Sequence, residues 1–294
     1  MTATPRILIV GSHGQVTRAL QEELRGLGDI VVAGRDQGFD LSQPENLRHR
    51  VRELRPDLIV NPAAHTAVDQ AQNEPEPAFA INGIAPGVLA EEAAALGVPL
   101  IHYSTDYVFD GGKPTPYVEA DPTNPLNVYG QSKLAGEQAV AAVGGQHLIL
   151  RTSWVYSRYG KNFLLTLQRL LQERDELRIV ADQVGAPTWA GTIAQATRQI
   201  IERWAQDGEQ SWGVYHLTAR GETSWFGFAE AIGNALREQG KPCARLEPIP
   251  TSAYPTPAAR PLNSRLDCSK LTRDWGVRLP DWQVALQECL ASQA

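Results

Sequence analysis

Short apolar runs alternate with helix-like segments over the first half of the chain, and this alternation is the feature that most constrains the fold. Residues 6–10 (RILIV) form the first run, and Gly11 follows it directly. In residues 15–27 the valine and leucine residues then recur at helical spacing. The pattern predicts a strand, a tight turn and a helix.

The alternation continues up to residue 152. Further strands are predicted at 30–33, 57–61, 98–103 and 147–151, and further helices at 45–54, 78–96 and 129–143. Strands that alternate with helices form parallel sheets with right-handed crossovers. We therefore expect an α/β protein with a Rossmann-type doubly wound parallel sheet and a ligand crevice at the carboxyl ends of its strands.

The pattern loosens in the carboxyl half. Helices are predicted at 162–173, 191–205 and 224–239, and the stretch 248–261 carries five prolines that resist regular structure. We expect a dinucleotide-binding domain over 1–152 and a smaller, mainly substrate-binding lobe over 153–294. The segments near 177–181 and 213–218 are candidates to rejoin the main sheet.

Charge and composition exclude several classes of protein. The 294 residues include 27 basic and 33 acidic side chains, a net charge of −6, so no broad positive field is available for nucleic acid. The apolar run at the amino terminus is too short for a signal peptide or a membrane span, so we expect a cytoplasmic protein with no membrane partner. Three widely spaced cysteines predict neither a disulfide framework nor a zinc site.

A glycine-containing turn follows the first predicted strand. Gly11 and Gly14 let the backbone approach a pyrophosphate, and the helix after them offers free N–H groups and positive potential. Two glycines alone fit an ordinary turn equally well, but the strand before and the helix after favour a dinucleotide site. Thr17 stands where a third glycine would complete the pattern.

The end of the second predicted strand bears on the choice of cofactor. An acidic residue there normally binds the adenosine ribose, whereas this chain has Arg35. Because arginine pairs well with phosphate, we favour NADPH over NADH. The alternative is that Arg35 is a solvated surface residue. Asp40 and Leu41 in the next loop are further candidates to contact the adenosine.

Three residues form a candidate catalytic set. Tyr129 and Lys133 are four apart in a predicted helix and share one face. A neighbouring ammonium group is expected to lower the pKa of the phenol, which then donates a proton to a carbonyl oxygen. Thr105 follows the fourth strand and can hydrogen-bond the same oxygen. A lone Tyr-x-x-x-Lys pair is usually a surface contact, but its combination with the glycine turn favours a catalytic site.

This combination resembles the extended short-chain dehydrogenase/reductase family. Longer segments narrow the likeness to the dTDP-4-dehydrorhamnose reductase family over essentially the whole chain: VNPAAHTAVD (60–69), HYSTDYVFD (102–110), PLNVYG (125–130), RTSWVY (151–156), DQVGAPT (182–188), PTSAYPTPAARP (250–261) and NSRL (263–266).

The resemblance implies an NAD(P)H-dependent reduction of the C4 keto group of dTDP-4-dehydro-L-rhamnose to give dTDP-L-rhamnose. Tyr129 would supply the proton, Thr105 would polarise the carbonyl, and Lys133 would hold the nicotinamide ribose. Other cofactor contacts would come from Gln15, Val16, Ala64, His65, Thr66 and Tyr103. Substrate contacts would come from Thr105, Asp106, Trp154, Asp182, Gln183, Pro187, Arg260 and Asn263.

Some of these residues also fit purely structural roles. Trp154 also fits simple core packing, and His65 also fits a role in satisfying buried backbone. Arg260 and the 182–188 loop suit an anionic nucleotide, but they also suit ordinary surface turns. Some family members are magnesium-linked dimers that use helix carboxylates. This chain carries Ala19 and Gly191 at those positions, so we expect no metal, and a monomer or weak homodimer.

Other functions remain open at this point. A different sugar-nucleotide reductase or an epimerase would use similar residues. A dehydratase is disfavoured, because it would need an Asp-Glu pair after Thr105, where this chain has Asp106 and Tyr107. A non-catalytic regulatory subunit that binds a dinucleotide is the alternative from another class, although it would not need a positioned proton donor.

Overall fold

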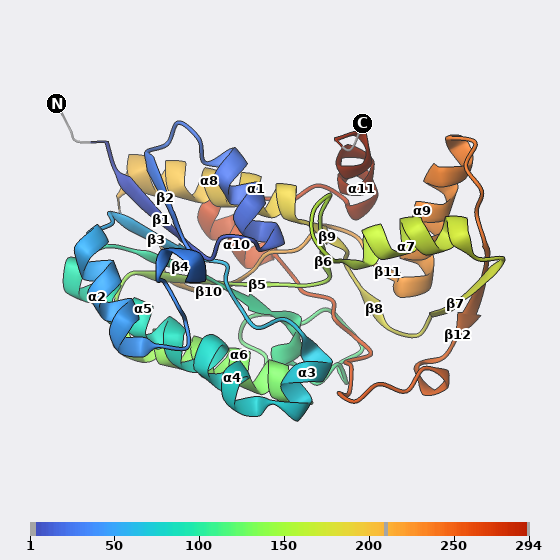
Figure 1. The fold of residues 1–294 in the computed structure, drawn as a ribbon, viewed down its shortest axis with the longest axis horizontal. Helices are drawn as coiled ribbons and strands as arrows, with labels where there is room; N and C mark the ends of the chain where they lie inside the picture. Colours follow the sequence, from blue (N-terminus) through green and yellow to red (C-terminus); the bar gives the residue numbers. More distant parts are fainter. Residues whose placement is uncertain (1–3, 209–210, 293–294) are drawn as a thin grey trace.

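A six-stranded parallel sheet forms the centre of the protein (Figure 1). The structure is a computed structural model that describes residues 4–208 and 211–292. The strand order is β10-β5-β4-β3-β1-β2. The strands are β1 (Arg6–Val10), β2 (Asp29–Ala33), β3 (Leu58–Asn61), β4 (Leu100–Thr105), β5 (His147–Thr152) and β10 (Gly213–His216). The predicted fold class is confirmed.

Helices cover both faces of this sheet, as Figure 1 shows. One face packs against α1 (Gln15–Glu23), α8 (Ala190–Asp207) and α10 (Ser269–Trp275), which contribute to one buried apolar cluster. The other face packs against α2 (Pro44–Leu54), α5 (Ala85–Leu96) and α6 (Val128–Val143), which contribute to a second. The central strands are buried on both faces, which explains why their sequences are nearly continuous apolar runs.

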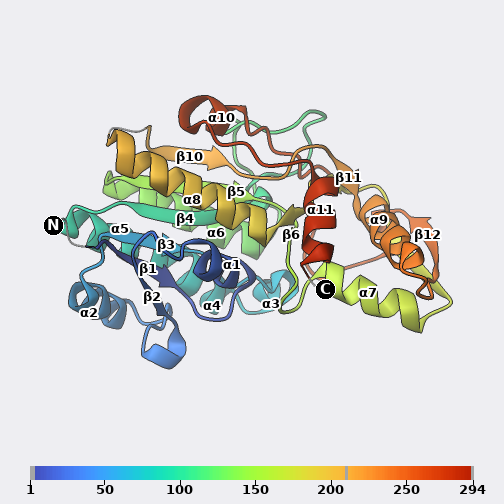
Figure 2. The same ribbon diagram turned by 90° about the horizontal axis from the view of Figure 1, so that it is seen from above.

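A smaller lobe lies beside the carboxyl ends of the strands (Figure 2). Its helices are α7 (Phe163–Glu173), α9 (Trp225–Glu238) and α11 (Trp282–Ala291). They enclose a separate apolar core that includes Tyr156, Phe228 and Trp282. Three two-stranded sheets complete it: β7 (Glu176–Val180) with β12 (Arg245–Ile249), β8 (Val184–Gly185) with β11 (Thr223–Ser224), and β6 (Val155–Tyr156) with β9 (Thr188–Trp189).

The carboxyl half of the chain is divided between the main sheet with its helices and the smaller lobe. β10 is the edge strand of the main sheet, and α8 and α10 pack on that sheet. The segment near 177–181, in contrast, does not rejoin the main sheet, because β7 pairs with β12 in the lobe. The reason lies in its polarity: β7 carries Glu176 and Arg178 on its exposed side, whereas an inner strand of a parallel sheet is apolar on both faces.

One predicted helix is interrupted. The segment 78–96 belongs to three elements: α4 (Pro75–Phe79), a wider π-helical turn (Ala80–Ile84) and α5. The short helix α3 (Val68–Asn73) precedes them, and α10 and α11 near the carboxyl end are also additional to the prediction. Single 3₁₀ turns cover Arg35–Gln37, Asp106–Val108 and Thr251–Ala253.

The strand order reverses between β1 and β3, since the chain passes from β2 on one side of β1 to β3 on the other. In doubly wound sheets a ligand crevice forms at this point, outside the carboxyl ends of the strands. Within the described ranges, the chain has no helix long and apolar enough to cross a membrane.

Candidate functional site

A cleft of about 660 Å³ opens at the carboxyl ends of β1, β3, β4 and β5. Its walls come from the glycine turn, the loop after β2, the loop after β3, the end of β4, the start of α6 and the segment after β6. All the predicted cofactor residues except His65 line it: Gly11, Gly14, Gln15, Val16, Arg35, Asp40, Leu41, Ala64, Thr66, Tyr103, Tyr129 and Lys133.

The glycine turn is built for a close backbone approach. Gly11 has a φ of 89°, in the left-handed region, and a Cβ there would lie 3.0 Å from the Cβ of Ala63. Gly14 begins α1 without a side-chain cap, so no side chain caps the free N–H groups of the first turn. A bound anion can take their place.

Two buried hydroxyl groups in the same cleft have no partner among the described residues. They are the Oγ of Ser104 and the Oγ1 of Thr152, at the ends of β4 and β5. A buried polar atom without a partner is unfavourable unless a ligand or water supplies a hydrogen bond. The glycine turn and these two hydroxyls therefore fit a dinucleotide that runs across the strand ends.

Arg35 lies at the mouth of the cleft. Its side chain is 73% exposed, and its Nε is 3.5 Å from Oδ2 of Asp40. The pKa of Asp40 is lowered first by the backbone N–H of Ser42 and to a smaller degree by Arg35. Arg35 thus keeps most of its guanidinium group available for a ribose phosphate.

Tyr129 lies deeper in the cleft. Burial raises the pKa of its phenol to about 12; the Thr105 hydroxyl opposes this shift, whereas the Asp106 carboxylate adds to it. The ring of Tyr107 packs edge-on against it, with centroids 5.4 Å apart. The expectation that Lys133 lowers the pKa of this phenol is wrong: burial dominates the shift, and the groups that modify it are Thr105 and Asp106. Tyr129 is therefore protonated at neutral pH, as a proton donor must be.

Lys133 is fully buried on the next turn of α6 and reaches the cleft. Its Nζ donates to the backbone oxygen of Tyr103 at 2.6 Å and lies 3.3 Å from Nε2 of His102. Burial lowers its pKa to about 8, and the carboxylate of Glu137 opposes the shift. The ammonium group is held by β4 rather than by Tyr129.

Thr105 ends β4 next to the phenol. Its Oγ1 donates to Oδ1 of Asp106 at 3.1 Å and accepts from the backbone N–H of Tyr107 at 3.2 Å. Asp106 is buried, and its Oδ2 has no partner among the described residues. Burial raises the pKa of Asp106 to about 6, although hydrogen bonds from Ser264 and Thr105 oppose this shift. Near pH 6 this carboxyl group can either donate to or accept from a ligand, and at higher pH it mainly accepts.

Two predicted cofactor residues, His65 and Tyr103, have polar groups that bond within the protein. His65 does not line the cleft; instead its backbone N–H and C=O bond to the side chain of Asn82, at 2.7 and 3.0 Å. Tyr103 does line the cleft, but its hydroxyl bonds to Oγ1 of Thr197 at 2.6 Å. That hydroxyl is therefore occupied by α8.

Trp154 lies between β5 of the main sheet and β6 of the smaller lobe. Its ring stacks on Trp225 with centroids 3.7 Å apart, and its φ of 49° is unusual for a residue with a side chain. A Cβ at Gly185 would lie 2.7 Å from the ring, so a glycine is required there. The indole is half-buried and fixed by its neighbours, which suits a wall for a planar base or a sugar ring.

The loop 182–188 is held by hydrogen bonds within the protein. Asp182 accepts from the backbone N–H and the hydroxyl of Thr251, and Gln183 links Thr251 to Nε1 of Trp225. Pro187 is buried. In this structure the side chains of Asp182 and Gln183 order the lobe and support Trp154 through Trp225.

Arg260 and Asn263 lie in the proline-rich segment and just after it. Arg260 donates to Asp69 Oδ2 at 2.9 Å and to the Ala258 carbonyl at 2.8 Å, and its charge opposes the rise that burial causes in the pKa of Tyr107. Asn263 donates to the carbonyls of Lys113 and Thr115 and accepts from Arg265. Asn263 is therefore fully used in joining two loops, whereas Arg260 lies close to the aromatic pair beside Thr105.

Several site residues were missed by sequence reasoning. Ser104 and Thr152 could have been found, because they directly follow predicted strands at the ligand edge. Tyr107 follows the predicted catalytic threonine, and Lys161 enters the cleft from the segment after β6. Asn82 carried no local signal, because its role depends on contacts with residues 17 and 50 positions away.

Ala19 and Gly191, the two positions at which some family members carry magnesium-binding carboxylates, lie close together. Ala19 and Gly191 line one small hollow with Glu22 and Arg158. A Cβ at Gly191 would lie 2.5 Å from the ring of Trp189, so a longer side chain would not fit without movement of that ring. Within the described ranges, no three histidine, cysteine, aspartate or glutamate residues gather as metal ligands do.

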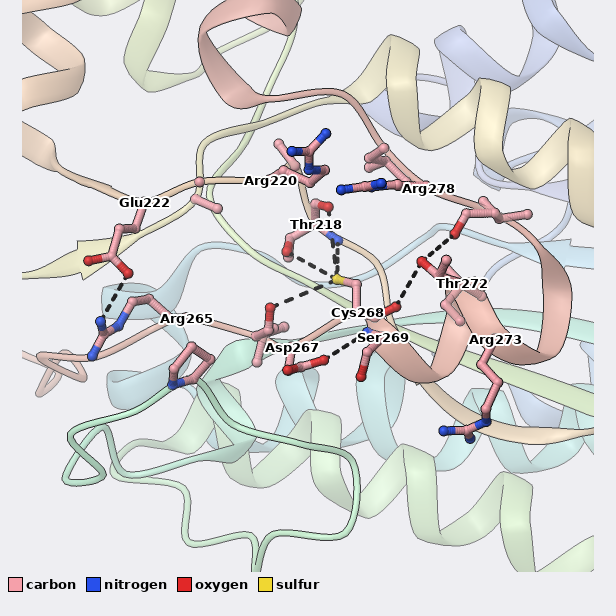
Figure 3. A pocket seen from close by; sticks show the side chains of 18 residues that line it. Thr218, Arg220, Glu222, Arg265, Asp267, Cys268, Ser269, Thr272, Arg273 and Arg278 are labelled. Atoms are coloured by element: carbon pink, nitrogen blue, oxygen red, sulfur yellow. Dashed lines mark hydrogen bonds and ion pairs between the residues drawn. The ribbon is translucent and has the colours of Figure 1, made fainter.

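A second groove of about 650 Å³ lies between residues 218–222 and 265–279 (Figure 3). Arg265 pairs with Glu222 at 2.9 Å there, and Sγ of Cys268 accepts from the backbone N–H of Thr218. Its size matches that of the first cleft, so size does not identify the site. The groove contains none of the predicted site residues, whereas the first cleft contains the glycine turn, Tyr129 and Lys133.

Comparisons with known proteins agree with this assignment. The family model described as RmlD substrate binding domain matches residues 5–294. The dTDP-4-dehydrorhamnose reductase of Burkholderia thailandensis is 49% identical over 292 residues, covering 97% of this chain and 98% of the relative. The enzyme of that name from Escherichia coli K12 is 47% identical over 289 residues, covering 97% and 96%.

A solved structure extends the likeness to three dimensions. The dTDP-4-dehydrorhamnose reductase of Bacillus anthracis, crystallised in complex with NADP, matches with a TM-score of 0.90 at 34% identity. The match covers 98% of this chain and 99% of that one. The resemblance read from the sequence motifs is confirmed. This chain belongs to the RmlD family, the family of the dTDP-4-dehydrorhamnose reductases.

Proposed function

We propose that the protein uses NADPH to reduce the C4 keto group of dTDP-4-dehydro-L-rhamnose, which gives dTDP-L-rhamnose. The observation that carries the proposal is that Tyr129 and Lys133 line the same cleft as the glycine turn, with the Thr105 hydroxyl next to the Tyr129 phenol. The names of the relatives, and the NADP in one relative's crystal structure, support the choice of substrate and cofactor.

The chain's own groups divide the work of the reaction. The glycine turn and the first turn of α1 bind the pyrophosphate, and NADPH supplies a hydride when it is bound. Thr105 donates to Asp106 in this structure and is assigned to turn that proton to the C4 oxygen of the bound substrate. The protonated phenol of Tyr129 gives that oxygen its proton as negative charge develops. Lys133 stays protonated beside them and stabilises the negative charge.

The smaller lobe is assigned to the nucleotide part of the substrate. Trp154 offers a flat apolar wall, and Arg260 offers a guanidinium group close to the reacting centre for the diphosphate. Asp106, which neighbours Thr105, is assigned to a sugar hydroxyl. Asp182, Gln183, Pro187 and Asn263 are assigned supporting roles, because their contacts are within the protein.

The direct test is the oxidation of NADPH with a panel of nucleotide-linked 4-keto sugars. We expect consumption equal to the keto sugar supplied, with the thymidine-linked 6-deoxy sugar preferred. Turnover without net NADPH consumption would indicate an epimerase. If the protein binds NADPH but reduces no member of the panel, and Tyr129→Phe leaves its biological role intact, a regulatory subunit is indicated instead.

The cofactor preference has its own test. Because Arg35 offers its guanidinium group at the position of the ribose phosphate, Arg35→Ala should weaken NADPH binding about tenfold and leave NADH binding nearly unchanged. Fluorescence titration with each cofactor measures both constants. Arg169→Ala, at an exposed arginine of α7 paired with Glu173, is the matched control. Equal losses for the two cofactors would reject the role of Arg35.

A further inference from the structure

His102 is a fully buried residue of β4 that the catalytic assignment leaves unused. It lies between Lys133 and Asn61: Nε2 is 3.3 Å from the lysine Nζ, and Nδ1 is 3.1 Å from the Nδ2 of Asn61. His102 is inaccessible to solvent, so its ring nitrogens must find their hydrogen-bond partners within the protein, and Lys133 is buried except where it lines the cleft.

The proton positions follow from the donors and acceptors. A lysine ammonium group can only donate, so the Nε2 of His102 must accept, and the ring proton must sit on Nδ1. The backbone of Asn61 offers an acceptor to the ring. The Asn61 side chain, however, directs its amide nitrogen at Nδ1 of His102. Its buried Oδ1 has no hydrogen-bond partner among the described residues. Turning the amide by 180° presents Oδ1 to the N–H at Nδ1 as an acceptor.

Counting donors and acceptors in the same way fixes the orientation of the Lys133 ammonium group. One N–H of its ammonium group goes to the Tyr103 backbone oxygen, and a second goes to His102. The third is left for the cleft, which Lys133 lines. The two bonds to β4 therefore select one orientation of a side chain that is otherwise flexible.

We propose that neutral His102, oriented by Asn61, is a positioning residue that holds Lys133 as an ammonium group with one N–H directed into the cleft. The inference deepens the proposed function and rests on it for the role of Lys133. His102 does not carry protons in this scheme, because burial and the nearby Lys133 both keep the ring neutral.

The other charged groups near Lys133 are accounted for by their own contacts. Glu137, on the same helix, is paired with Arg151 of β5 by two short bonds of 2.9 and 2.7 Å. Tyr129 is neutral, and Asp106 lies beside Tyr129 after β4. His102 is therefore the acceptor whose removal changes the lysine without disturbing another ion pair.

The test compares two polar substitutions. In His102→Gln the side-chain oxygen can still reach Lys133, whereas in His102→Asn it reaches only toward Asn61. The readout is the pKa of Lys133, measured by NMR in protein labelled with ¹³C at lysine Cε, without any ligand. Assignment is practical because the chain has five lysines, Lys113, Lys133, Lys161, Lys241 and Lys270, and Lys133→Arg removes one signal.

We expect Lys133 to titrate at about 8 in the wild type. His102→Asn should lower that pKa by about one unit, because the ammonium form loses a charge-assisted hydrogen bond, and His102→Gln should restore most of it. The alkaline limb of the reductase pH profile should move with it. His216→Asn, at a buried histidine of β10, is the control and should leave the Lys133 signal unchanged.

Two results would overturn the inference: a Lys133 pKa in His102→Asn equal to that of the wild type, or an equal shift in His216→Asn. Because the titration needs no substrate, it separates this inference from the proposed function. If the wild type has no reductase activity but His102→Asn still shifts the pKa of Lys133, the proposed function is rejected and the contact between His102 and Lys133 is retained.

Discussion

Burial acts on Tyr129 and Lys133 in opposite directions. It raises the pKa of the phenol to about 12 and lowers that of the ammonium group to about 8. Both shifts favour the neutral forms, because a buried charge is poorly solvated. The phenol thus remains a proton source over the whole neutral range, and the lysine is the group that sets the upper pH limit.

Asp106 gives a prediction at the same scale. Burial raises its pKa from 3.8 to about 6, so the folded state prefers the protonated carboxyl group. The stability that this preference adds is fully present below pH 3.8 and is lost as the pH rises through 6. Asp106→Asn cannot ionise, and it should gain about 2 kcal/mol over the wild type between about pH 4.5 and about pH 7.5.

Urea unfolding of both proteins at the two pH values measures this difference. Subtracting the wild type from the variant removes the effects of all other titrating groups. A difference that is the same at both pH values would mean that Asp106 does not titrate in this range in the folded protein.

The sequence predicted a candidate catalytic set but not its electrostatics. Tyr129, Lys133 and Thr105 follow from spacing and from strand ends, both of which are local properties. The direction of the Tyr129 shift could not be predicted, since it depends on how deeply helix α6 is buried. The contact between His102 and Lys133 could not be predicted either, because it depends on the packing of α6 against β4.

At the scale of elements, the π-helical turn at Ala80–Ile84 shapes the cofactor side of the cleft. Pro86 has no N–H, so the Asn82 carbonyl four residues earlier has no α-helical partner in the chain. The Asn82 side chain holds the loop after β3 through the His65 backbone and donates to Ser132 of α6 at 3.0 Å. The turn therefore ties the cofactor loop to the helix that carries Tyr129.

Gly136 of α6 makes this contact possible. A Cβ at position 136 would lie 2.1 Å from the backbone oxygen of Asn82. Gly136→Ala should therefore lower the free energy of unfolding by about 3 kcal/mol, despite the better helix propensity of alanine. Gly112→Ala is the control: a Cβ there meets nothing closer than 3.4 Å, and its effect should stay within about 0.5 kcal/mol.

Chemical denaturation of the two variants checks the expectation. Equal stabilities would show that α6 and the π-helical turn can move apart without cost. The sequence predicted one continuous helix here from its alanine content, although Pro86 inside that segment is a local signal of an interruption. Helices α10 and α11 were missed for a related reason: they are short and are stabilised mainly by the cores that they cover.

At the scale of the whole molecule, the proline-rich segment links the lobe to the sheet domain. Arg260 pairs with Asp69 of α3, and Asn127 at the start of α6 donates to the Ala259 carbonyl at 2.7 Å. These contacts bring residues more than 130 positions apart to the mouth of the catalytic site. The sequence indicated that the segment was functional, but the partner elements depended on the tertiary fold.

Arg260→Ala should raise the KM for the nucleotide sugar at least tenfold and leave NADPH binding unchanged, because the diphosphate loses a charge-assisted contact. Arg245→Ala, at the far edge of the lobe, removes an exposed arginine that is paired with Glu176 and should affect neither constant. Steady-state kinetics with each substrate varied in turn distinguish the two. An unchanged sugar-nucleotide KM in Arg260→Ala would remove this residue from the site.

The central claim is that hydride reaches a keto carbon whose oxygen is protonated by Tyr129. Transfer of deuterium from NADPH labelled at nicotinamide C4, followed by NMR of the sugar product in a single turnover, tests it most directly. The wild type should place deuterium at C4 of the sugar, and Tyr129→Phe should do so about 10²–10⁴-fold more slowly while binding NADPH equally well. Deuterium at another carbon, or an undiminished rate in Tyr129→Phe, would contradict the account.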